Sequence, residues 1–291
     1  MLKAMIRKCG PAKLRTPLTS MELAILSDEI SLDLEEAIRL GDEMGFRKYE
    51  IRCLDDYEHR VPDFLPGRIE RLKELVEKQQ IEITALTPGT FKCRLNETEQ
   101  LRKDMDDLLP RACELARKLG APRIISFSFL QGGGSEAEAL DRMREAAAIV
   151  GEHGLELAVE NEPGFWFDTG VNTARLMEAL SLDHVGVNWD PANSVIAGEA
   201  AYPVGYDAVL PFIRNVHVKD SIPLPDGKWE NRLLGNGGVN WVGQLAALLR
   251  DRPVEHITLE THVFPVLEAT REDLRRYEFL TAAARQLLAE T

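Results

Sequence analysis

Short apolar runs alternate along the chain with stretches in which apolar residues recur every three or four positions. The runs have the length and composition of β-strands, whereas the periodic stretches are typical of amphipathic helices. Eight runs are predicted to be strands, over residues 22–26, 46–53, 81–86, 123–130, 155–160, 185–190, 213–218 and 256–260. Their starts lie about 25 to 43 residues apart, the spacing of repeated strand–helix units.

Helical periodicity fills the gaps between these strands. It predicts helices over residues 33–44, 66–78, 97–118, 136–153, 173–180, 241–250 and 271–289. Ser135 is placed to cap one of them, and Pro110 is expected to kink or split another. Because no Ser-, Gly- or Pro-rich linker divides the chain, the pattern predicts an α/β protein with a single (β/α)8 TIM barrel over residues 21–291.

The charges are distributed unevenly along the chain. Residues 1–20 hold five basic and no acidic side chains, which leaves 30 basic and 48 acidic residues for the rest. The first segment lacks the apolar stretch of a signal peptide, so we expect an extension before the barrel; a start of translation at Met21 is the alternative. An acidic body repels phosphate backbones and argues against a nucleic-acid partner. The apolar runs are too short to cross a membrane.

The cysteines are widely spaced and form no Cys-x-x-Cys pair. They are Cys9, Cys53, Cys93 and Cys113. This spacing predicts free thiols in a reducing cytoplasm and argues against a disulfide framework or a thiolate metal site. Assembly into a homo-oligomer is left open by the sequence.

Four consecutive predicted strands carry polar residues on one face only. In residues 155–160, for example, one face is wholly apolar and the other ends in Glu160. The polar faces of the next three strands end at Asp190, His217 and Glu260. These positions are the carboxyl ends of the strands, where TIM barrels place their chemistry. Buried carboxylates are tolerated only with a positive partner, so we expect a compensating charge there.

A single divalent cation compensates this charge in one step. Three carboxylates and a neutral imidazole carry about three negative charges, and their hard donor atoms suit Mn²⁺, Mg²⁺ or Co²⁺. Zn²⁺ is less favoured without thiolates. The alternative is that Lys219, Arg52 or Arg214 neutralises the carboxylates without a metal.

The segments around these residues resemble the sugar phosphate isomerase/epimerase family of xylose isomerase-like TIM barrels. The similar segments are Leu157-Ala158-Val159-Glu160-Asn161, Asn188-Trp189-Asp190-Pro191-Ala192-Asn193, Val216-His217-Val218-Lys219-Asp220, Leu259-Glu260-Thr261-His262 and, more weakly, residues 46–52 and 235–241. The resemblance covers the chain from Met21 onward. It implies one catalytic divalent metal on Glu160, Asp190, His217 and Glu260, with the two glutamates as the proton-transfer pair.

The resemblance implies a divalent-metal-dependent isomerase or epimerase that acts on a small keto sugar or polyol. Such an enzyme removes a proton α to a carbonyl and passes through an enediolate. The same site supports a lyase or dehydratase acting on a keto-inositol or 3-keto-glycoside. A more distant alternative is a DNA repair enzyme like endonuclease IV, although that family uses many more histidines than the six present here.

Five further residues are expected to bind the substrate at the same face. Lys219 and His262 each follow a predicted ligand by two positions and share its strand face, with a solvated rim position as the alternative. Asn193 and Glu162 are expected to bind hydroxyl groups, and both replace a histidine that relatives often carry. Arg52 is expected near the substrate or paired with its neighbour on the same strand, Glu50.

Two loops at this face also have compositions that suggest a role. Trp166, within Phe165-Trp166-Phe167, is expected either to stack on a sugar ring or to plug the core. The stretch over residues 220–238 is rich in Pro and Gly and long for a strand–helix connection, which is typical of a lid.

Overall fold

A barrel of parallel strands forms the centre of the molecule. The structure, a computed structural model, describes residues 21–290, so the predicted extension over residues 1–20 and Cys9 lie outside the described residues. The barrel strands are β1 (Glu22–Leu26), β2 (Lys48–Ile51), β3 (Glu82–Leu86), β4 (Arg123–Ser126), β5 (Glu156–Glu160), β6 (Val185–Trp189), β7 (Ile213–Val218) and β10 (His256–Leu259). They close in the order β1-β10-β7-β6-β5-β4-β3-β2. The predicted (β/α)8 TIM barrel is confirmed.

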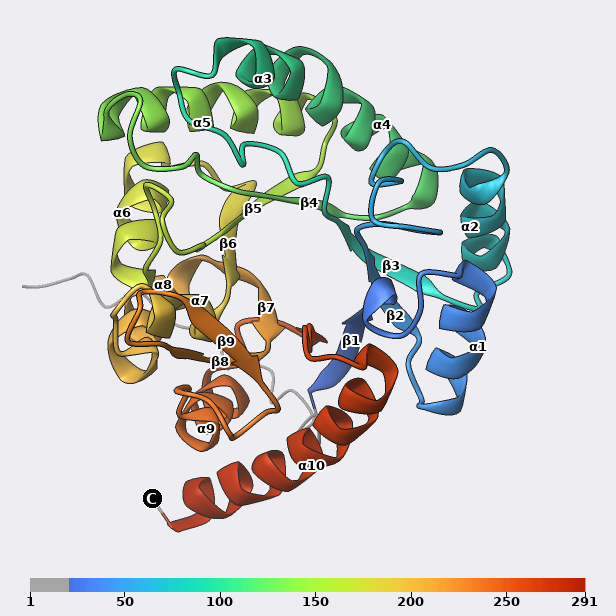
Figure 1. Ribbon diagram of the computed structural model, residues 1–291, viewed down its shortest axis with the longest axis vertical. Helices are drawn as coiled ribbons and strands as arrows, with labels where there is room; N and C mark the ends of the chain where they lie inside the picture. The colour runs from blue at the N-terminus through green and yellow to red at the C-terminus, as the bar shows by residue number, and fades with distance from the viewer. Residues whose placement is uncertain (1–20, 291) are drawn as a thin grey trace, which may run out of the picture.

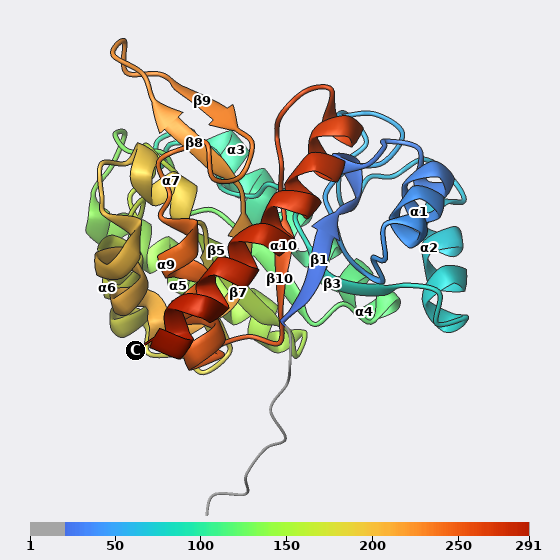
Figure 2. The ribbon, with the colours of Figure 1, turned by 90° about the horizontal axis from the view of Figure 1, so that it is seen from below.

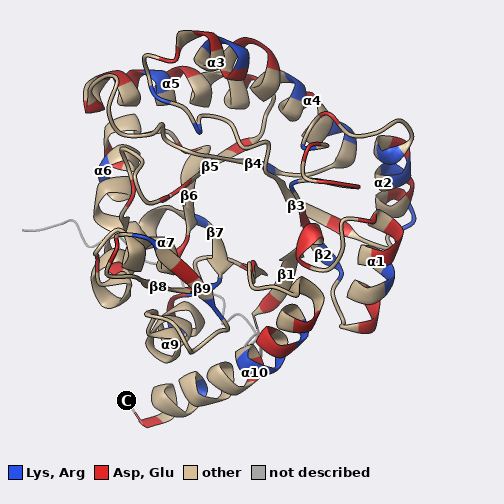
Figure 3. Cartoon of the chain, viewed as in Figure 1, with Lys and Arg blue, Asp and Glu red and all other residues tan. Residues whose placement is uncertain are grey.

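Helices surround the barrel on its outer side (Figure 1). They are α1 (Leu34–Glu43), α2 (Arg68–Glu77), α3 (Thr98–Lys103), α4 (Leu109–Leu119), α5 (Glu136–Glu152), α6 (Gly170–Leu180), α7 (Pro191–Ile196), α8 (Tyr206–Val209), α9 (Trp241–Asp251) and α10 (Val266–Glu290). Charged residues of both signs are interspersed on these helices (Figure 3). Within residues 21–290, no helix combines the length and apolar character needed to span a membrane.

Local signals explain where several helices begin and break. Ser135 accepts a hydrogen bond from the amide of Glu138, whose side chain returns a bond to the Ser135 amide, and this capping box begins α5. The helix predicted over residues 97–118 is split into α3 and α4 by a π-turn (Asp104–Leu108). Pro110 lies in the first turn of α4, directly after this π-turn, and lacks the N–H that would continue the helical hydrogen bonds.

Regular structure also occurs in two stretches where the pattern predicts none. Residues 191–212 hold α7, a π-turn, α8 and a 3₁₀ turn, segments too short to display a helical period. The predicted loop over residues 220–238 contains an antiparallel hairpin of β8 (Asp220–Pro223) and β9 (Trp229–Arg232). This hairpin projects from the end of the barrel toward which β1 points (Figure 2).

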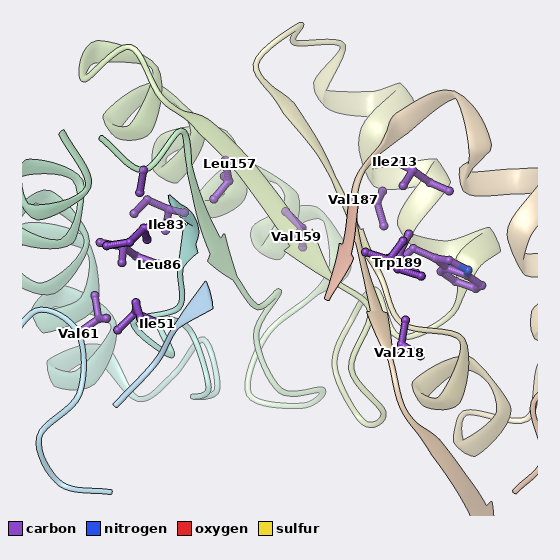
Figure 4. Packing of buried hydrophobic residues seen from close by; sticks show 14 of the residues in the cluster. Ile51, Val61, Ile83, Leu86, Leu157, Val159, Val187, Trp189, Ile213 and Val218 are labelled. Carbon is purple, nitrogen blue, oxygen red and sulfur yellow. The ribbon is translucent and has the colours of Figure 1, made fainter. Parts of the chain in front are cut away.

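Strand side chains divide between the outside and the inside of the barrel as their alternation predicts. Leu157 and Val159 of β5 pack on the outer side in one large core shared with the helices (Figure 4). A separate apolar cluster of the described residues is small and consists of Ala85, Ile125 and Ala158. Buried polar residues also occupy the interior of the barrel, so the barrel has a polar centre inside an apolar shell.

A buried aspartate anchors the hairpin to the glycine-containing segment that precedes α9. The carboxylate of Asp220 accepts hydrogen bonds from the amides of Gly235, Gly237 and Val239 at 2.9, 3.0 and 3.2 Å. A Cβ atom on Gly237 would lie 2.0 Å from Asp220 Oδ1, so only glycine permits this approach. The base of the hairpin is therefore tied to the barrel end that carries the polar centre.

Candidate metal centre

Four buried side chains converge at the carboxyl ends of neighbouring strands. Glu160 ends β5, Asp190 follows β6, His217 lies near the end of β7, and Glu260 follows β10. Each offers one ligand atom, and these atoms all lie within 4.8 Å of one another. We call these residues the carboxylate–histidine cluster. They are the four positions that strand alternation singles out in the sequence.

Protein groups already hold the cluster in place. His217 Nδ1 lies 3.0 Å from Glu260 Oε2 and 3.5 Å from Glu160 Oε2. The other carboxylate oxygen of Glu160 accepts a hydrogen bond of 3.0 Å from Asn193 Nδ2. Nδ1 of the imidazole therefore faces the carboxylates that would bind a metal.

Lys219 supplies a positive charge to the same cluster. Its Nζ lies 2.7 Å from Asp190 Oδ2 and 3.1 Å from Glu260 Oε2. The side chain is only 8% exposed, which excludes the solvated rim position considered from the sequence. Lys219 thus balances part of the negative charge that the strand pattern predicts.

The carboxylates of the cluster have unequal proton affinities. Burial opposes the ionisation of Glu260, but the charges of Lys219 and His217 outweigh it and hold its pKa well below the ordinary value. For Asp190, burial together with the neighbouring Glu160 outweighs the attraction of Lys219 and raises the pKa to about 6. Ionisation is therefore most favourable on the glutamate closest to both cations.

Glu50 of β2 reaches His217 across the barrel interior, a contact that the sequence did not indicate. Its Oε2 lies 3.0 Å from His217 Nε2, while its Oε1 accepts a hydrogen bond of 2.6 Å from Thr87 Oγ1. Although burial opposes the imidazolium, Glu260 and then Glu50 raise the pKa of His217 well above its ordinary value. The expected pairing of Glu50 with Arg52 is wrong, because Glu50 turns to His217.

Two predicted substrate-binding residues contact Glu260 directly. Arg52 Nη1 lies 3.3 Å from Glu260 Oε1, and its Nη2 lies 2.6 Å from Asp28 Oδ2. His262 Nε2 lies 3.4 Å from Glu260 Oε1, and its Nδ1 bonds to Glu29. The buried acids Asp28 and Glu29, just after β1, therefore orient the two cationic groups beside Glu260.

Glu160, His217 and Glu260 of the cluster line one cavity of about 170 Å³. Pockets for drug-sized ligands measure roughly 300–1,000 Å³, so this cavity suits a smaller molecule. The predicted substrate-binding residues that line it are Lys219, Asn193, His262, Glu162 and Arg52. Phe127 and Trp229 are aromatic side chains of its wall.

Trp166 does not line this cavity, and its prediction as a stacking residue is wrong. The amide of Trp166 donates a hydrogen bond of 3.0 Å to the carbonyl of Phe129, and Phe165 forms a bridge with Leu130. These backbone contacts hold the aromatic run along the segment after β4, and the Trp166 ring packs against the core. The alternative interpretation, a core plug, describes its position.

The donor set fits one hard divalent cation. Three carboxylates and one imidazole converge, with no thiolate among them. With Glu50 included, four acidic side chains face Lys219 and His217. A histidine binds a metal through a neutral imidazole, so binding an ion would release the extra proton of His217. The positive charge of the ion would then balance the carboxylates in place of the imidazolium.

Comparison with known proteins agrees with this architecture. Among solved structures, the IOLI protein with a bound zinc atom has a TM-score of 0.72 at 17% identity, covering 91% of this chain and 98% of that chain. A structure of L-ribulose 3-epimerase also has a TM-score of 0.72, at 15% identity with 92% and 96% covered. A xylose isomerase-like TIM barrel protein from Mycobacterium smegmatis in complex with magnesium has a TM-score of 0.67 at 18% identity, with 93% and 100% covered. At such identities these likenesses show a shared fold.

Two sequence comparisons differ in what they cover. A curated human protein, DENN domain-containing protein 1B, is 27% identical over 151 residues, which make up 50% of this chain and 18% of that protein. The chain spans less than a fifth of that protein, so none of its properties is transferred. Residues 38–281, by contrast, match the family model described as xylose isomerase-like TIM barrel. Because this match covers most of the chain, the protein belongs to the xylose isomerase-like TIM barrel family.

Proposed function

We propose that this protein is a divalent-metal-dependent isomerase or epimerase of a small keto sugar or polyol. The observation that carries the proposal is the carboxylate–histidine cluster, whose ligand atoms gather within 4.8 Å and whose Glu160, His217 and Glu260 line a cavity of about 170 Å³. Glu160, Asp190, His217 and Glu260 would hold the ion, with Mn²⁺, Mg²⁺ or Co²⁺ favoured by the oxygen-rich set. When bound, the ion would polarise a substrate carbonyl and stabilise negative charge on its oxygen.

In this proposal, the two glutamates move a proton on either side of the substrate. Glu160 and Glu260 come from β5 and β10, which are separated in the barrel by β6 and β7. One carboxylate would take the proton from the carbon next to the carbonyl. The C–H electron pair would form a carbon–carbon double bond while the carbonyl π pair passes to the oxygen, giving an enediolate. Return of a proton from the other glutamate to the opposite face inverts that carbon, which is epimerisation. Return of a proton to the former carbonyl carbon gives isomerisation, provided that the proton of the neighbouring hydroxyl passes to the former carbonyl oxygen.

Cationic side chains would hold Glu260 in its ionised form, the form of a carboxylate that can accept a proton. Lys219 and His217 lower the pKa of Glu260 despite its burial. Arg52 and His262 lie within 3.4 Å of the same carboxylate and fix its orientation. The hydroxyl groups of a sugar would find partners in Asn193 and Glu162 on the cavity wall.

The histidine placement argues against a DNA repair enzyme with several metals. Of the six histidines, all of which lie in the described part of the chain, His217 and His262 line the cavity. His153 and His184 instead bond to the carbonyls of Ile149 and Ala147 on α5. A multi-metal site built from many imidazoles has no counterpart in this cavity.

The test is proton exchange measured by NMR in D₂O. The Mn²⁺-, Mg²⁺- or Co²⁺-loaded protein is incubated with a panel of keto sugars, keto-inositols and 3-keto-glycosides. Deuterium at the α-carbon of a product of unchanged composition supports the proposal. Loss of water or of the aglycone would show a lyase or dehydratase instead. Absence of exchange with every compound would contradict the proposed function.

Variants of the glutamates test their role in proton transfer. Glu160→Gln and Glu260→Gln should each lower the exchange rate by about 10²–10⁴-fold, the usual contribution of a positioned acid or base. Glu156→Gln is the matched control on the same strand, because Glu156 pairs with Arg123 and lies outside the cavity. Exchange that survives in both site variants at the control rate would contradict the assignment.

A further inference from the structure

Two walls of different charge face each other across the cavity. The carboxylate–histidine cluster comes from β5, β6, β7 and β10, which are neighbours in the barrel. On the opposite arc, the segments after β2 and β3 bring Arg60 and Lys92 to the same cavity. A molecule that fills the cavity would therefore meet the cluster on one side and these cations on the other.

Arg60 differs from the other cations of this cavity because its guanidinium forms no hydrogen bond or ion pair with a group of residues 21–290. Each of the others pairs with a carboxylate: Arg52 with Asp28, Lys219 with Asp190, and Lys92 with Glu162. Among the described residues, no side chain or carbonyl hydrogen-bonds or ion-pairs with the guanidinium of Arg60. Burial and the charge of Arg52 lower the pKa of Arg60, but a guanidinium stays protonated at neutral pH.

Backbone contacts hold the segment that carries Arg60. Arg60 forms a bridge with Cys53, and its amide donates a hydrogen bond of 3.0 Å to the carbonyl of Glu58. Its Nε and Nη2 atoms lie 3.9 Å from the position that a Cβ would take on Gly89, in the segment after β3. A partly buried guanidinium held against a neighbouring loop keeps five N–H donors without acceptors from the protein.

We propose that Arg60 binds an oxyanion of the substrate, so that the substrate is an anionic keto sugar or keto polyol. This inference rests on the proposed function. The planar guanidinium donates two parallel hydrogen bonds to a carboxylate or a phosphate, the ligand chemistry that its geometry matches best. Lys92, whose Nζ lies 3.8 Å from the centre of the Phe127 ring, adds positive charge to the same wall.

A matched set of substrates tests this specificity. Exchange in D₂O by the Mn²⁺-loaded protein is compared for a neutral keto sugar, the same sugar with a terminal carboxylate, and the same sugar with a terminal phosphate. We expect one anionic member to exceed the neutral sugar in kcat/KM by about 10- to 100-fold, the effect of one charge-assisted hydrogen-bonded pair. The preferred member shows whether the group is a carboxylate or a phosphate.

Arg60→Met should reduce this preference to about one, and Arg60→Lys should restore part of it. The control is Arg94→Met, because Arg94 is exposed, pairs with Glu97 and lies outside the cavity. It should keep the wild-type preference. Equal rates for neutral and anionic members in the wild type, or a preference that survives in Arg60→Met, would overturn the inference while leaving the proposed function intact.

A binding measurement separates this inference from the proposed reaction. Metal-stripped protein is titrated with acetate and with inorganic phosphate by calorimetry, which needs no turnover. The wild type should bind one of them, with at least about 10-fold weaker binding in Arg60→Met. Binding that depends on Arg60 without any proton exchange would support the anion site and contradict the reaction. Binding that is absent or independent of Arg60 would overturn the anion site.

Discussion

Glu50 holds one ring nitrogen of His217 and leaves the other nitrogen facing the cluster. Glu50 lies 3.0 Å from Nε2, and Nδ1 faces Glu160 and Glu260. Asn188 donates a hydrogen bond of 3.0 Å to Glu160, beside the same ring. Carboxylates that hydrogen-bond to a metal-binding imidazole fix its orientation and raise its basicity. Glu50 is thus a positioning residue for the proposed metal site.

Glu50→Gln should weaken binding of Mn²⁺ by about 10- to 100-fold, because the amide cannot support the imidazole as a carboxylate does. Calorimetric titration of metal-stripped protein measures this affinity. Glu82→Gln is the control, since Glu82 is an exposed residue of β3 that pairs with Lys48. Equal affinities in the two variants would contradict a positioning role for Glu50.

The positive charge of Lys219 is expected to stabilise the metal-free protein. Lys219→Met would leave Asp190 and Glu260 without their nearest ammonium group and should lower the free energy of unfolding by about 3–5 kcal/mol, as for other broken buried ion pairs. Added Mn²⁺ should stabilise this variant more than the wild type, because the ion no longer competes with the lysine.

Urea unfolding with and without Mn²⁺ measures both effects. Lys228→Met is the control, because Lys228 is exposed on the hairpin and pairs with Asp226. If the metal stabilised Lys219→Met and the wild type equally, the proposed competition between lysine and metal would be refuted.

At the scale of elements, the barrel could be predicted because apolar and polar residues alternate along its strands in the sequence. Segment 155–160 reads apolar on one side and polar on the other, and its structure follows that division. The hairpin β8–β9 was missed because its strands are four residues long and carry no apolar alternation. Glu50 and Arg60 were missed as functional residues for another reason: their environment is set by strands distant in the chain.

Asp220→Ala should release the base of the hairpin. It removes the acceptor of four amides, those of Ser221, Gly235, Gly237 and Val239, and should cost about 3 kcal/mol of unfolding free energy. It should also raise KM, since Trp229 on β9 lines the cavity.

The matched control for this variant is Asp226→Ala at the exposed turn of the hairpin, where Asp226 pairs with Lys228. Urea unfolding and the KM of any substrate found by the exchange assay compare the two variants. A loss of stability as small as that of Asp226→Ala would show that Asp220 does not anchor the hairpin.

For the whole molecule, buried titratable groups couple stability to pH. His256 lies at the start of β10, where burial and the charges of Arg123 and Lys48 lower its pKa to about 4. Above the ordinary histidine pKa of about 6.5, His256 does not change the free energy of unfolding, because its ring is neutral in both the folded and the unfolded state. As the pH falls toward 4, only the unfolded state takes up the proton, so stability is lost.

This group should cost the wild type about 2 kcal/mol of unfolding free energy between pH 7 and pH 5. His256→Gln removes the titrating ring and should lessen the acid sensitivity by that amount. Urea unfolding at both pH values provides the measurement. An unchanged difference between pH 7 and pH 5 in the variant would refute the assignment to His256.

The central claim is that one divalent ion binds among Glu160, Asp190, His217 and Glu260. Anomalous X-ray diffraction from crystals soaked in Mn²⁺ tests it most directly. We predict one strong anomalous peak within bonding distance of all four side chains, and its loss in crystals of Glu260→Gln. A cluster without a peak in the wild type, with Lys219 still bound to Asp190, would contradict the account.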